Sequence, residues 1–524
     1  MDTTIQAGGT DDRPELIFAL VGFAGAPLDD LSTALKTSLK TFNYQPVDIR
    51  LSDLLVNVRG VTVQDRQPGE CARIRYLQQK GDAFRDKLKK KDPLARAAIT
   101  AIRTKRAERS GSPDKPAAAH AYILRQLKLP EEVNLLRHVY GSAFVLVGGH
   151  APSSIRISHL ASLAAGNVSE ATQVIDVDEK EHTEFGQNTQ DTYPKADFFA
   201  NLYPPGAEAE VERFVELLFG HPLHTPSPDE YAMYQARAAS LRSSDDNRQV
   251  GAVIVRRGQD ISRKDADVIA VGTNEVPRAG GGFYWDKDSP DYRDQQLLKR
   301  GQDRATNIKI DVLAELIETM KQKKWLQDTI AETNKHDIAR DLLPSLKGTQ
   351  FLNIGEFSRP VHAEMASLID AARRGVPVAD QVMFVTTFPC HNCAKHIIAA
   401  GIEQVIYLEP YHKSRALQLY GEEIVSDWLT TDKDATKVGF FAFTGIGPRL
   451  YEQLFSMSAR GAKMGNSLET WQERRRSLRP LYVQHNASML YVAAERQALD
   501  ELPTEVYDWD KKSVCPDPDA KAGE

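Results

Sequence analysis

The hydrophobic and polar positions of this chain alternate between short apolar runs and longer amphipathic stretches. The run LIFALV at 16–21 predicts a buried strand, which leads through the glycine turn GFAGAP into the helical pattern LDDLSTALKTSLKTF. Further strand candidates, separated by helical patterns, lie at 47–51, 144–149, 173–177 and 197–202. This alternation predicts a parallel sheet with helices on both faces.

A second set of elements opens near His221. A helical pattern through DEYAMYQARAASLRS precedes strands predicted at 249–255 and 267–277. The pattern resumes with a helix at 362–374, the strand VMFVTT, a helix at 390–400 and the strand QVIYLEP. The sequence therefore predicts a second α/β domain.

Two stretches are predicted to lie outside these cores. Residues 278–358 form an insertion with a balanced, solvated charge composition, and helical spacing recurs there at Ile310, Leu313, Ile317 and Met320. Residues 104–120 are charged and rich in serine, proline and alanine, so they predict an exposed loop or arm. We expect domains at 14–220 and 221–505, with a disordered tail at 1–13 and a polar tail at 506–524.

Composition narrows the class of protein. The chain has 524 residues, a formal net charge of −6 and four cysteines. Mild acidity argues against a protein that coats nucleic acid, and four cysteines cannot supply a secreted disulfide scaffold. The N-terminus lacks the positive start and apolar run of a signal peptide, and LIFALVGFAGAPL is too short to span a bilayer. We expect a cytoplasmic protein with no membrane partner.

The candidate metal-binding and catalytic residues lie in two segments, RPVHAEMAS and FPCHNC. His362 begins one predicted helix and Cys390 another, with Cys393 three residues on. Imidazole and thiolate are ligands that Zn²⁺ accepts, and a catalytic zinc has three protein ligands plus water. Glu364 follows His362 by two residues, where its carboxyl could move protons without being a ligand. The alternatives for the cysteine pair are a redox pair, which needs no H-x-E partner, and half of a structural zinc site, which needs a fourth ligand.

The pattern H-x-E…P-C-x-x-C is the signature of zinc nucleobase deaminases. Together with SLRSSDDNRQVGAVIV and GTNEVP, these motifs resemble the deoxycytidylate deaminase family. The resemblance implies that Asn274 holds the sugar and that Arg248 and Gln249 contact substrate. It also implies that Tyr411 and Lys413, in EPYHKS, approach the phosphate; each could equally be a surface loop residue.

The N-terminal half, through AYILRQLKLPEEVNLLRHVYG and EFGQNTQDTYPKADFF, resembles a P-loop kinase-like domain fused to such a deaminase. Gly22 and Gly25 would belong to the P-loop-like turn. A working P-loop ends in GK[ST], whereas here APLDDL follows and places Asp29 and Asp30 at the helix start. We therefore expect no kinase activity; the turn could serve packing or sense a nucleotide.

This organisation resembles that of the anti-phage dCTP deaminases. The resemblance implies conversion of dCTP, and of dCMP, to the uracil nucleotide, and it implies a homo-oligomer. The alternatives are a dCMP deaminase of pyrimidine salvage, a nucleic-acid deaminase, and a P-loop sensor with a vestigial site. The cluster Arg474, Arg475, Arg476 and Arg479 is either a solvated helix face or a contact for a triphosphate or small regulatory RNA effector.

Overall fold

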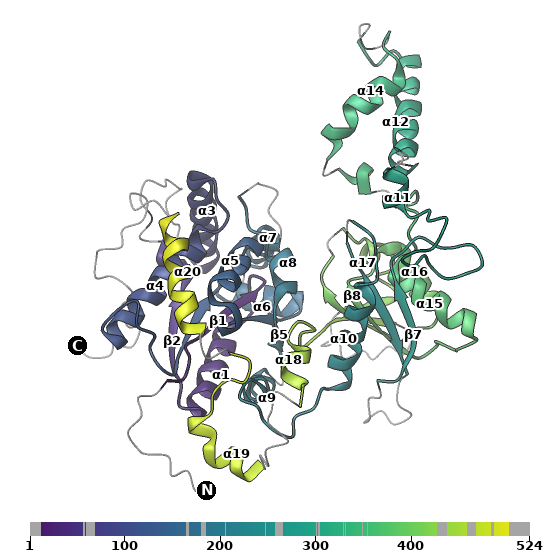
Figure 1. Cartoon of the computed structure of the whole chain (residues 1–524). Helices are drawn as coiled ribbons and strands as arrows, with labels where there is room; N and C mark the ends of the chain where they lie inside the picture. The colour runs from purple at the N-terminus through teal and green to yellow at the C-terminus, as the bar shows by residue number, and fades with distance from the viewer. Residues whose placement is uncertain are drawn as a thin grey trace. The chain divides into compact units, whose positions relative to one another are not determined.

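A computed structural model describes most of the chain (Figure 1). The described residues are 12–501, apart from 56–57, 59–68, 164–166, 180–184, 205, 247, 257–265, 300, 302–303, 328–329, 331, 348, 354, 412, 427–436, 458–467 and 484–486. The expected tails at 1–13 and 506–524 lie wholly or almost wholly outside this part.

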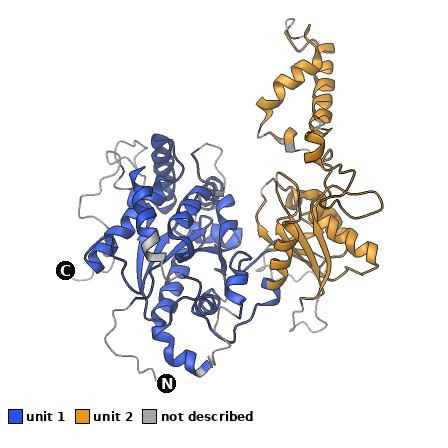
Figure 2. Ribbon diagram, in the orientation of Figure 1, with its two compact units in different colours: residues 1–230, 426–429, 442–524 blue, residues 231–425, 430–441 orange. Residues whose placement is uncertain are grey.

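The chain divides into two compact units (Figure 2). Unit 1 comprises residues 1–230, 426–429 and 442–524, and unit 2 comprises 231–425 and 430–441. The sequence pattern assigned residues up to 505 to the second domain, but those after 441 pack on unit 1. The reason is that strand β12 (Gly445–Ile446) pairs with β5 (Phe198–Asn201), and helix α20 (Ala487–Asp500) packs on α4 (Pro93–Ser110) and α5 (Pro130–Tyr140).

Unit 1 is built on a six-stranded sheet in the order β12-β5-β4-β1-β3-β2. All neighbouring pairs from β5 to β2 are parallel, and only β12 runs antiparallel to its neighbour. The central strand β1 (Leu16–Gly22) is buried along its whole length, as its unbroken apolar run predicts. The other strands are β2 (Gln45–Arg50), β3 (His120–Arg125) and β4 (Phe144–His150).

Helices connect these strands, as a parallel sheet requires. Besides α4, α5 and α20 they are α1 (Leu28–Thr41), α2 (Leu51–Leu54), α3 (Glu70–Leu88), α6 (Ser153–Leu163), α7 (Val168–Glu179), α8 (Thr189–Thr192), α9 (Glu208–Leu218), α18 (Tyr451–Phe455) and α19 (Leu468–Arg474). Short 3₁₀ turns are η2 (Gly141–Ala143), η3 (Tyr193–Lys195) and η7 (Arg475–Ser477).

Two expectations for unit 1 were wrong. Residues 173–177 form part of helix α7, not a strand, because Ala171, Val174, Ile175 and Asp178 recur at helical spacing and are all buried. Residues 104–110 are the last turns of α4, which ends at Gly111 with a φ of 80°. The predicted loop therefore shrinks to the segment before β3, a strand that the pattern analysis did not mark.

Unit 2 contains a second six-stranded sheet, in the order β10-β11-β9-β8-β6-β7. Strand β6 is antiparallel to β7 and β8, whereas β8 and β9 are parallel. The strands are β6 (Gly251–Val255), β7 (Val268–Thr273), β8 (Val382–Thr387), β9 (Gln404–Glu409), β10 (Ile424–Val425) and β11 (Val438–Ala442). Helices of this unit are α10 (Pro228–Ser240, which begins in unit 1), α15 (Ala363–Arg374), α16 (His391–Ala399) and α17 (Ala416–Leu419).

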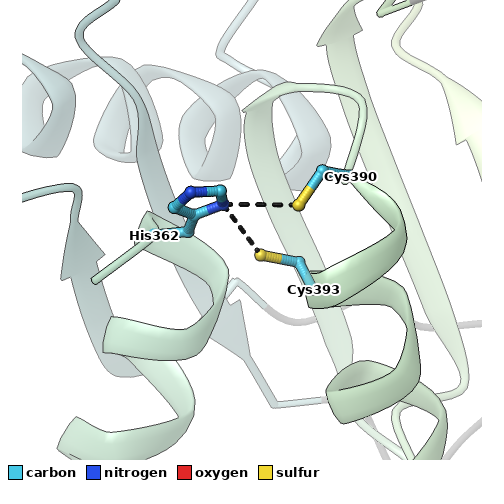
Figure 3. Close-up of side chains that lie close together, drawn as sticks. All are labelled: His362, Cys390 and Cys393. Carbon is cyan, nitrogen blue, oxygen red and sulfur yellow. Dashed lines mark hydrogen bonds between the residues drawn. The ribbon is translucent and has the colours of Figure 1, made fainter. Parts of the chain in front are cut away.

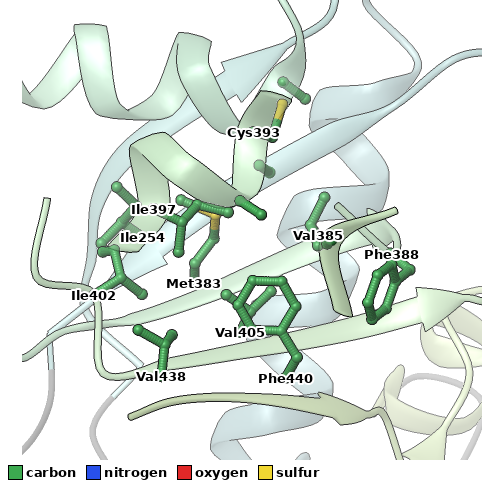
Figure 4. Packing of buried hydrophobic residues seen from close by; sticks show 14 of the residues in the cluster. Ile254, Met383, Val385, Phe388, Cys393, Ile397, Ile402, Val405, Val438 and Phe440 are labelled. Carbon is green, nitrogen blue, oxygen red and sulfur yellow. The ribbon is translucent and has the colours of Figure 1, made fainter. Parts of the chain in front are cut away.

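Helix α15 lies against β7 and β6, at a very short distance from the backbone of Gly272. A Cβ at Gly272 would come within 2.0 Å of the Ala363 carbonyl oxygen, so no other residue fits there without moving the helix. Apolar side chains from β6, β8, β9, β11 and α16 fill the core beside it (Figure 4). Since Cys393 and Ala363 belong to this core, the starts of both helices are held rigidly.

The insertion has a small core of its own. It contains α11 (Asp294–Leu298), α12 (Arg304–Gln322), α14 (Lys335–Leu342), η4 (Leu343–Leu346) and η5 (Gln350–Asn353). The predicted positions Ile310, Leu313 and Ile317 pack on Ala339 of α14, whereas Met320 is only partly buried.

Candidate metal centre

His362 and Cys390 occupy equivalent places at the starts of two neighbouring helices. His362 is the N-cap of α15 and Cys390 the N-cap of α16, both with extended backbone angles. Strand β8 and Pro389 lead directly into Cys390, and the first turn of α16 brings Cys393 back beside it. Helices α15 and α16 pack on each other, so three side chains distant in sequence converge.

The three side chains face one point (Figure 3). His362 Nδ1 lies 3.3 Å from Cys390 Sγ and 3.4 Å from Cys393 Sγ. With zinc–nitrogen and zinc–sulfur bonds of usual length, tetrahedral coordination separates these donors by about 3.6 Å. The cluster is therefore close to the spacing that a zinc ion needs, and the residues fit that ion. His362, Cys390 and Cys393 are the predicted ligand set, and the structure brings them together, while their role as metal ligands stays a prediction.

The ionisation of the cluster suits a cation. Hydrogen bonds from Cys393 and His362 lower the pKa of the Cys390 thiol to about 4. In turn, the hydrogen bond with Cys390 raises the pKa of His362 to about 9, and the pKa of Cys393 lies well above its usual range because its thiol donates to Cys390. A metal ion would take the place of these shared protons and ionise both thiols.

Glu364 lies in the first turn of α15 and is 4% exposed. Burial, reinforced by the negative charge of Cys390, raises the pKa of its carboxyl to about 7. A carboxyl whose pKa is close to neutrality can both accept and return a proton, which is what a general acid–base group must do.

The predicted sugar-binding residue Asn274 follows β7 and is buried. Its side-chain nitrogen donates to the carbonyl of Arg248 at 2.8 Å, and its side-chain oxygen accepts from the amide of Val250, also at 2.8 Å. Gln249 donates to the carbonyl of Ser243 at 2.7 Å. Both amides therefore shape the loop before β6, and substrate contact by either stays a prediction.

Arg248, in the loop before β6, lies beside Tyr411, which follows β9. The Arg248 guanidinium is 5.7 Å from the centre of the Tyr411 ring and 3.7 Å from a carboxylate oxygen of Glu409. Burial, and after it the negative charge of Cys390, raises the pKa of Tyr411, so this pair lies near the candidate metal ligands. Lys413 is exposed. Phosphate contact by Tyr411 and Lys413 is not tested by this geometry.

Two acidic residues with structural roles near the centre escaped the sequence analysis. Glu409 ends β9 and faces Arg248, and Glu275 accepts hydrogen bonds from the Ser244 amide and hydroxyl. Glu275 belongs to GTNEVP and Glu409 to QVIYLEP. Their closeness in sequence to Asn274 and Tyr411 could have marked them as residues near the candidate site. Glu275 also lines a cavity of about 430 Å³ that extends to Pro360, two residues before His362.

Asp178 and Arg156 contact the glycine turn that follows β1 in unit 1. Gly25 has a φ of 86°, and a Cβ there would lie 2.5 Å from the Arg156 carbonyl oxygen. The amide of Ala24 donates to the buried carboxylate of Asp178 at 2.8 Å, and Lys128 pairs with the other oxygen at 2.5 Å. An amide that a P-loop would offer to phosphate is thus taken by Asp178. The P-loop kinase-like assignment of Gly22 and Gly25 stays a prediction.

Two arginines of the cluster near the C-terminus form ion pairs with acidic side chains. Arg475 lies 3.3 Å from Glu216 and 3.7 Å from Glu212, and Arg479 pairs with Asp12. Arg475 and Arg479 thus contact acidic side chains, and binding of a triphosphate or small regulatory RNA effector by the cluster stays a prediction.

Comparison with known families covers the part of the chain that holds the metal cluster. Residues 226–409 match the cytidine and deoxycytidylate deaminase zinc-binding region. Over 55 residues the chain is 40% identical to the deoxycytidylate deaminase of Enterobacteria phage T2, which is 10% of this chain and 29% of that protein. A probable deoxycytidylate deaminase of Caenorhabditis elegans is 27% identical over 176 residues, which is 33% of this chain and 53% of that protein.

The chain therefore covers between about a third and a half of the length of these two deaminases. Among solved structures, the dCMP deaminase of cyanophage S-TIM5 aligns at 16% identity with a TM-score of 0.22, covering 42% of this chain and all of that one. A similarity this low supports no further conclusion. The deaminase region is described as zinc-binding, which agrees with Zn²⁺ as the predicted cofactor.

No helix among the described residues is both long and apolar enough to cross a membrane.

Proposed function

We propose that unit 2 catalyses the zinc-dependent hydrolytic deamination of deoxycytidine nucleotides, converting dCTP and dCMP to the uracil nucleotides and ammonia. The observation that carries the proposal is the His362, Cys390 and Cys393 cluster with Glu364 buried beside it. The match to the deaminase zinc-binding region supports the same chemistry.

In this proposal His362, Cys390 and Cys393 hold the zinc ion, which when bound lowers the pKa of a water molecule towards neutrality. Glu364 takes one proton from the water that attacks C4 and delivers it to N3 of the cytosine ring. It then takes the second proton, from the hydroxyl now bonded to C4, and passes it to the amine, which leaves as ammonia when the C4–N bond breaks and the C4 carbonyl forms. Its raised pKa suits both directions of transfer, and its burial excludes bulk water from the proton path.

In the same proposal, which rests here on the resemblance, Tyr411 and Lys413 approach the phosphates of the substrate. Lys413 is exposed and would bring positive charge to an anion. The cavity next to Pro360 suits phosphates less well, because Asp245, Asp246, Glu275 and Asp294 line it together with Arg304, Lys309 and Arg359. Lys413→Ala should therefore raise KM for dCTP more than KM for deoxycytidine.

The relatives named deoxycytidylate deaminases favour a second candidate, a dCMP deaminase of pyrimidine salvage. Depletion of dCTP in anti-phage defence rests on the resemblance of the whole organisation, and we propose it as the role of a dCTP-active enzyme. Assembly into a homo-oligomer belongs to the same proposal.

Zinc-replete protein should be offered dCMP, dCDP, dCTP, CTP, deoxycytidine and single-stranded DNA containing cytosine, with products separated by chromatography. Turnover of dCTP would support the defence role, whereas turnover of dCMP alone would make this a salvage enzyme. Turnover of DNA only, or of nothing, would contradict the proposal. The Glu364→Gln variant serves as the control for contaminating deaminases.

A further inference from the structure

Two histidines and a glutamate gather in unit 1, apart from the chemistry described above. Glu216 lies in the last turn of α9, and His221 and His224 follow in the stretch HPLH. The potential ligand atoms of the three side chains all lie within 4.8 Å of one another. We propose that Glu216, His221 and His224 form a second divalent-metal site, suited to zinc.

The donor set matches that metal. Two imidazoles and one carboxylate hold zinc in three-ligand sites, with water in the fourth position. His224 Nε2 is 2.6 Å from Glu216 Oε2, a separation at which the two atoms share a proton. Tetrahedral zinc would separate them by about 3.3 Å, so the side chains need to open by less than one ångström.

The local electrostatics favour a cation. Glu216 stands at the C-terminal end of α9, where backbone carbonyls concentrate negative potential. The positive charge of Arg475 offsets part of this negative potential. Arg475 lies 3.3 Å from Glu216 Oε1, whereas Glu216 Oε2 faces His224. Because Arg475 also approaches Glu212 at 3.7 Å, it can be shared between the two carboxylates when a metal binds.

The two imidazoles are packed, and one of them has to turn to bind a metal. The His221 and His224 rings are stacked with centroids 3.8 Å apart and an interplanar angle of 22°, and the Trp471 ring meets His221 edge-on at 4.7 Å. Because the lone pair of an imidazole nitrogen lies in the ring plane, one ring must turn out of the stack before both nitrogens can point at one metal ion. Trp471 is fixed by its own hydrogen bond to the Phe219 carbonyl at 3.0 Å, so we expect His224 to turn while His221 keeps its place.

Metal binding costs one weak interaction. The amide of Leu223 donates to His221 Nδ1 at 3.2 Å, and either mode of ligation by His221 disturbs this bond. The Leu223 side chain is exposed, so we expect water to replace the lost acceptor. The loss is small beside the bonds that the metal forms.

Metal content of the full chain tests the proposal. Protein equilibrated with Zn²⁺ and then desalted should hold two zinc ions per chain. His221→Phe, which keeps an aromatic ring against Trp471 but removes the ligand, should hold one, and so should Cys390→Ala. The exposed His138 lies outside the cluster, so His138→Ala should keep both.

Cobalt distinguishes the two sites without reference to deamination. Co²⁺ at the cysteine cluster gives intense thiolate charge-transfer absorption, whereas at Glu216, His221 and His224 it gives only weak d–d bands. Cys390→Ala protein should therefore keep weak bands that His221→Phe abolishes in the double variant. One zinc ion per wild-type chain, or two in His221→Phe, would overturn the second site while leaving the proposed deaminase intact.

Discussion

Two turns in this molecule carry a strand into a helix and present groups that could bind a ligand. At the start of α16, the turn after β8 directs Cys390 and Cys393 toward His362, and their donor atoms point at one another. At the start of α1, the turn after β1 contains Gly22 and Gly25, but Asp178 and Arg156 cover it from other helices. The groups at a helix start can therefore bind a ligand only where side chains from elsewhere in the fold do not already occupy them.

The largest effect is expected from substituting one of the proposed metal ligands. Cys390→Ala removes one thiolate, so the zinc content of that cluster should fall to background and deamination should drop below detection. Metal analysis and product chromatography on the same preparation measure both. Retained zinc together with full activity would mean that another residue completes the site.

Glu364→Gln should separate proton transfer from metal binding. The amide keeps the size of the side chain but cannot carry the proton, so kcat should fall by about 10²–10⁴-fold while zinc remains. Steady-state kinetics and metal analysis provide the measurement. A variant with the kcat of the wild type would remove Glu364 from the mechanism.

At the turn after β1, Gly25→Ala should reduce the stability of unit 1. The new Cβ would meet the Arg156 carbonyl oxygen in a backbone conformation that favours glycine, so unit 1 should lose about 1–3 kcal/mol of stability. Gly111 has a similar φ of 80° with open space around it, which makes Gly111→Ala the matched control at about 1 kcal/mol. Denaturant unfolding measures both, and equal losses would show that the contact with α6 is unimportant.

The smallest effect concerns Glu132 in the first turn of α5, close to Lys128, which pairs with Asp178. Its buried carboxylate accepts from the amides of Lys128 and Leu129, but burial dominates and raises its pKa. The folded state then binds more protons than the unfolded state above pH 4.5, so stability should decrease as pH rises through the raised pKa.

Glu132→Gln should lessen this decrease, because the amide accepts the same hydrogen bonds without titrating. Urea unfolding of both proteins between pH 4.5 and 8 gives the difference. Parallel pH profiles for wild type and variant would assign the pH dependence to other groups.

The local sequence pattern was sufficient to predict elements that depend on the spacing of nearby residues. The apolar run at 16–21, the helix starts at His362 and Cys390, and the helical spacing of Ile310, Leu313 and Ile317 all appear in the structure as predicted. It failed at 173–177, where five residues taken alone resemble a strand. The longer spacing through Ala171 and Asp178 belongs to a helix.

Residue identities at fixed local spacing were enough to predict the candidate zinc ligands and the break in the P-loop pattern. Long-range packing was needed to learn that Asp178 occupies the glycine turn, that α20 returns to unit 1, and that Glu216 meets His221 and His224 beside Trp471. These arrangements depend on packing between segments up to several hundred residues apart, which no local pattern encodes.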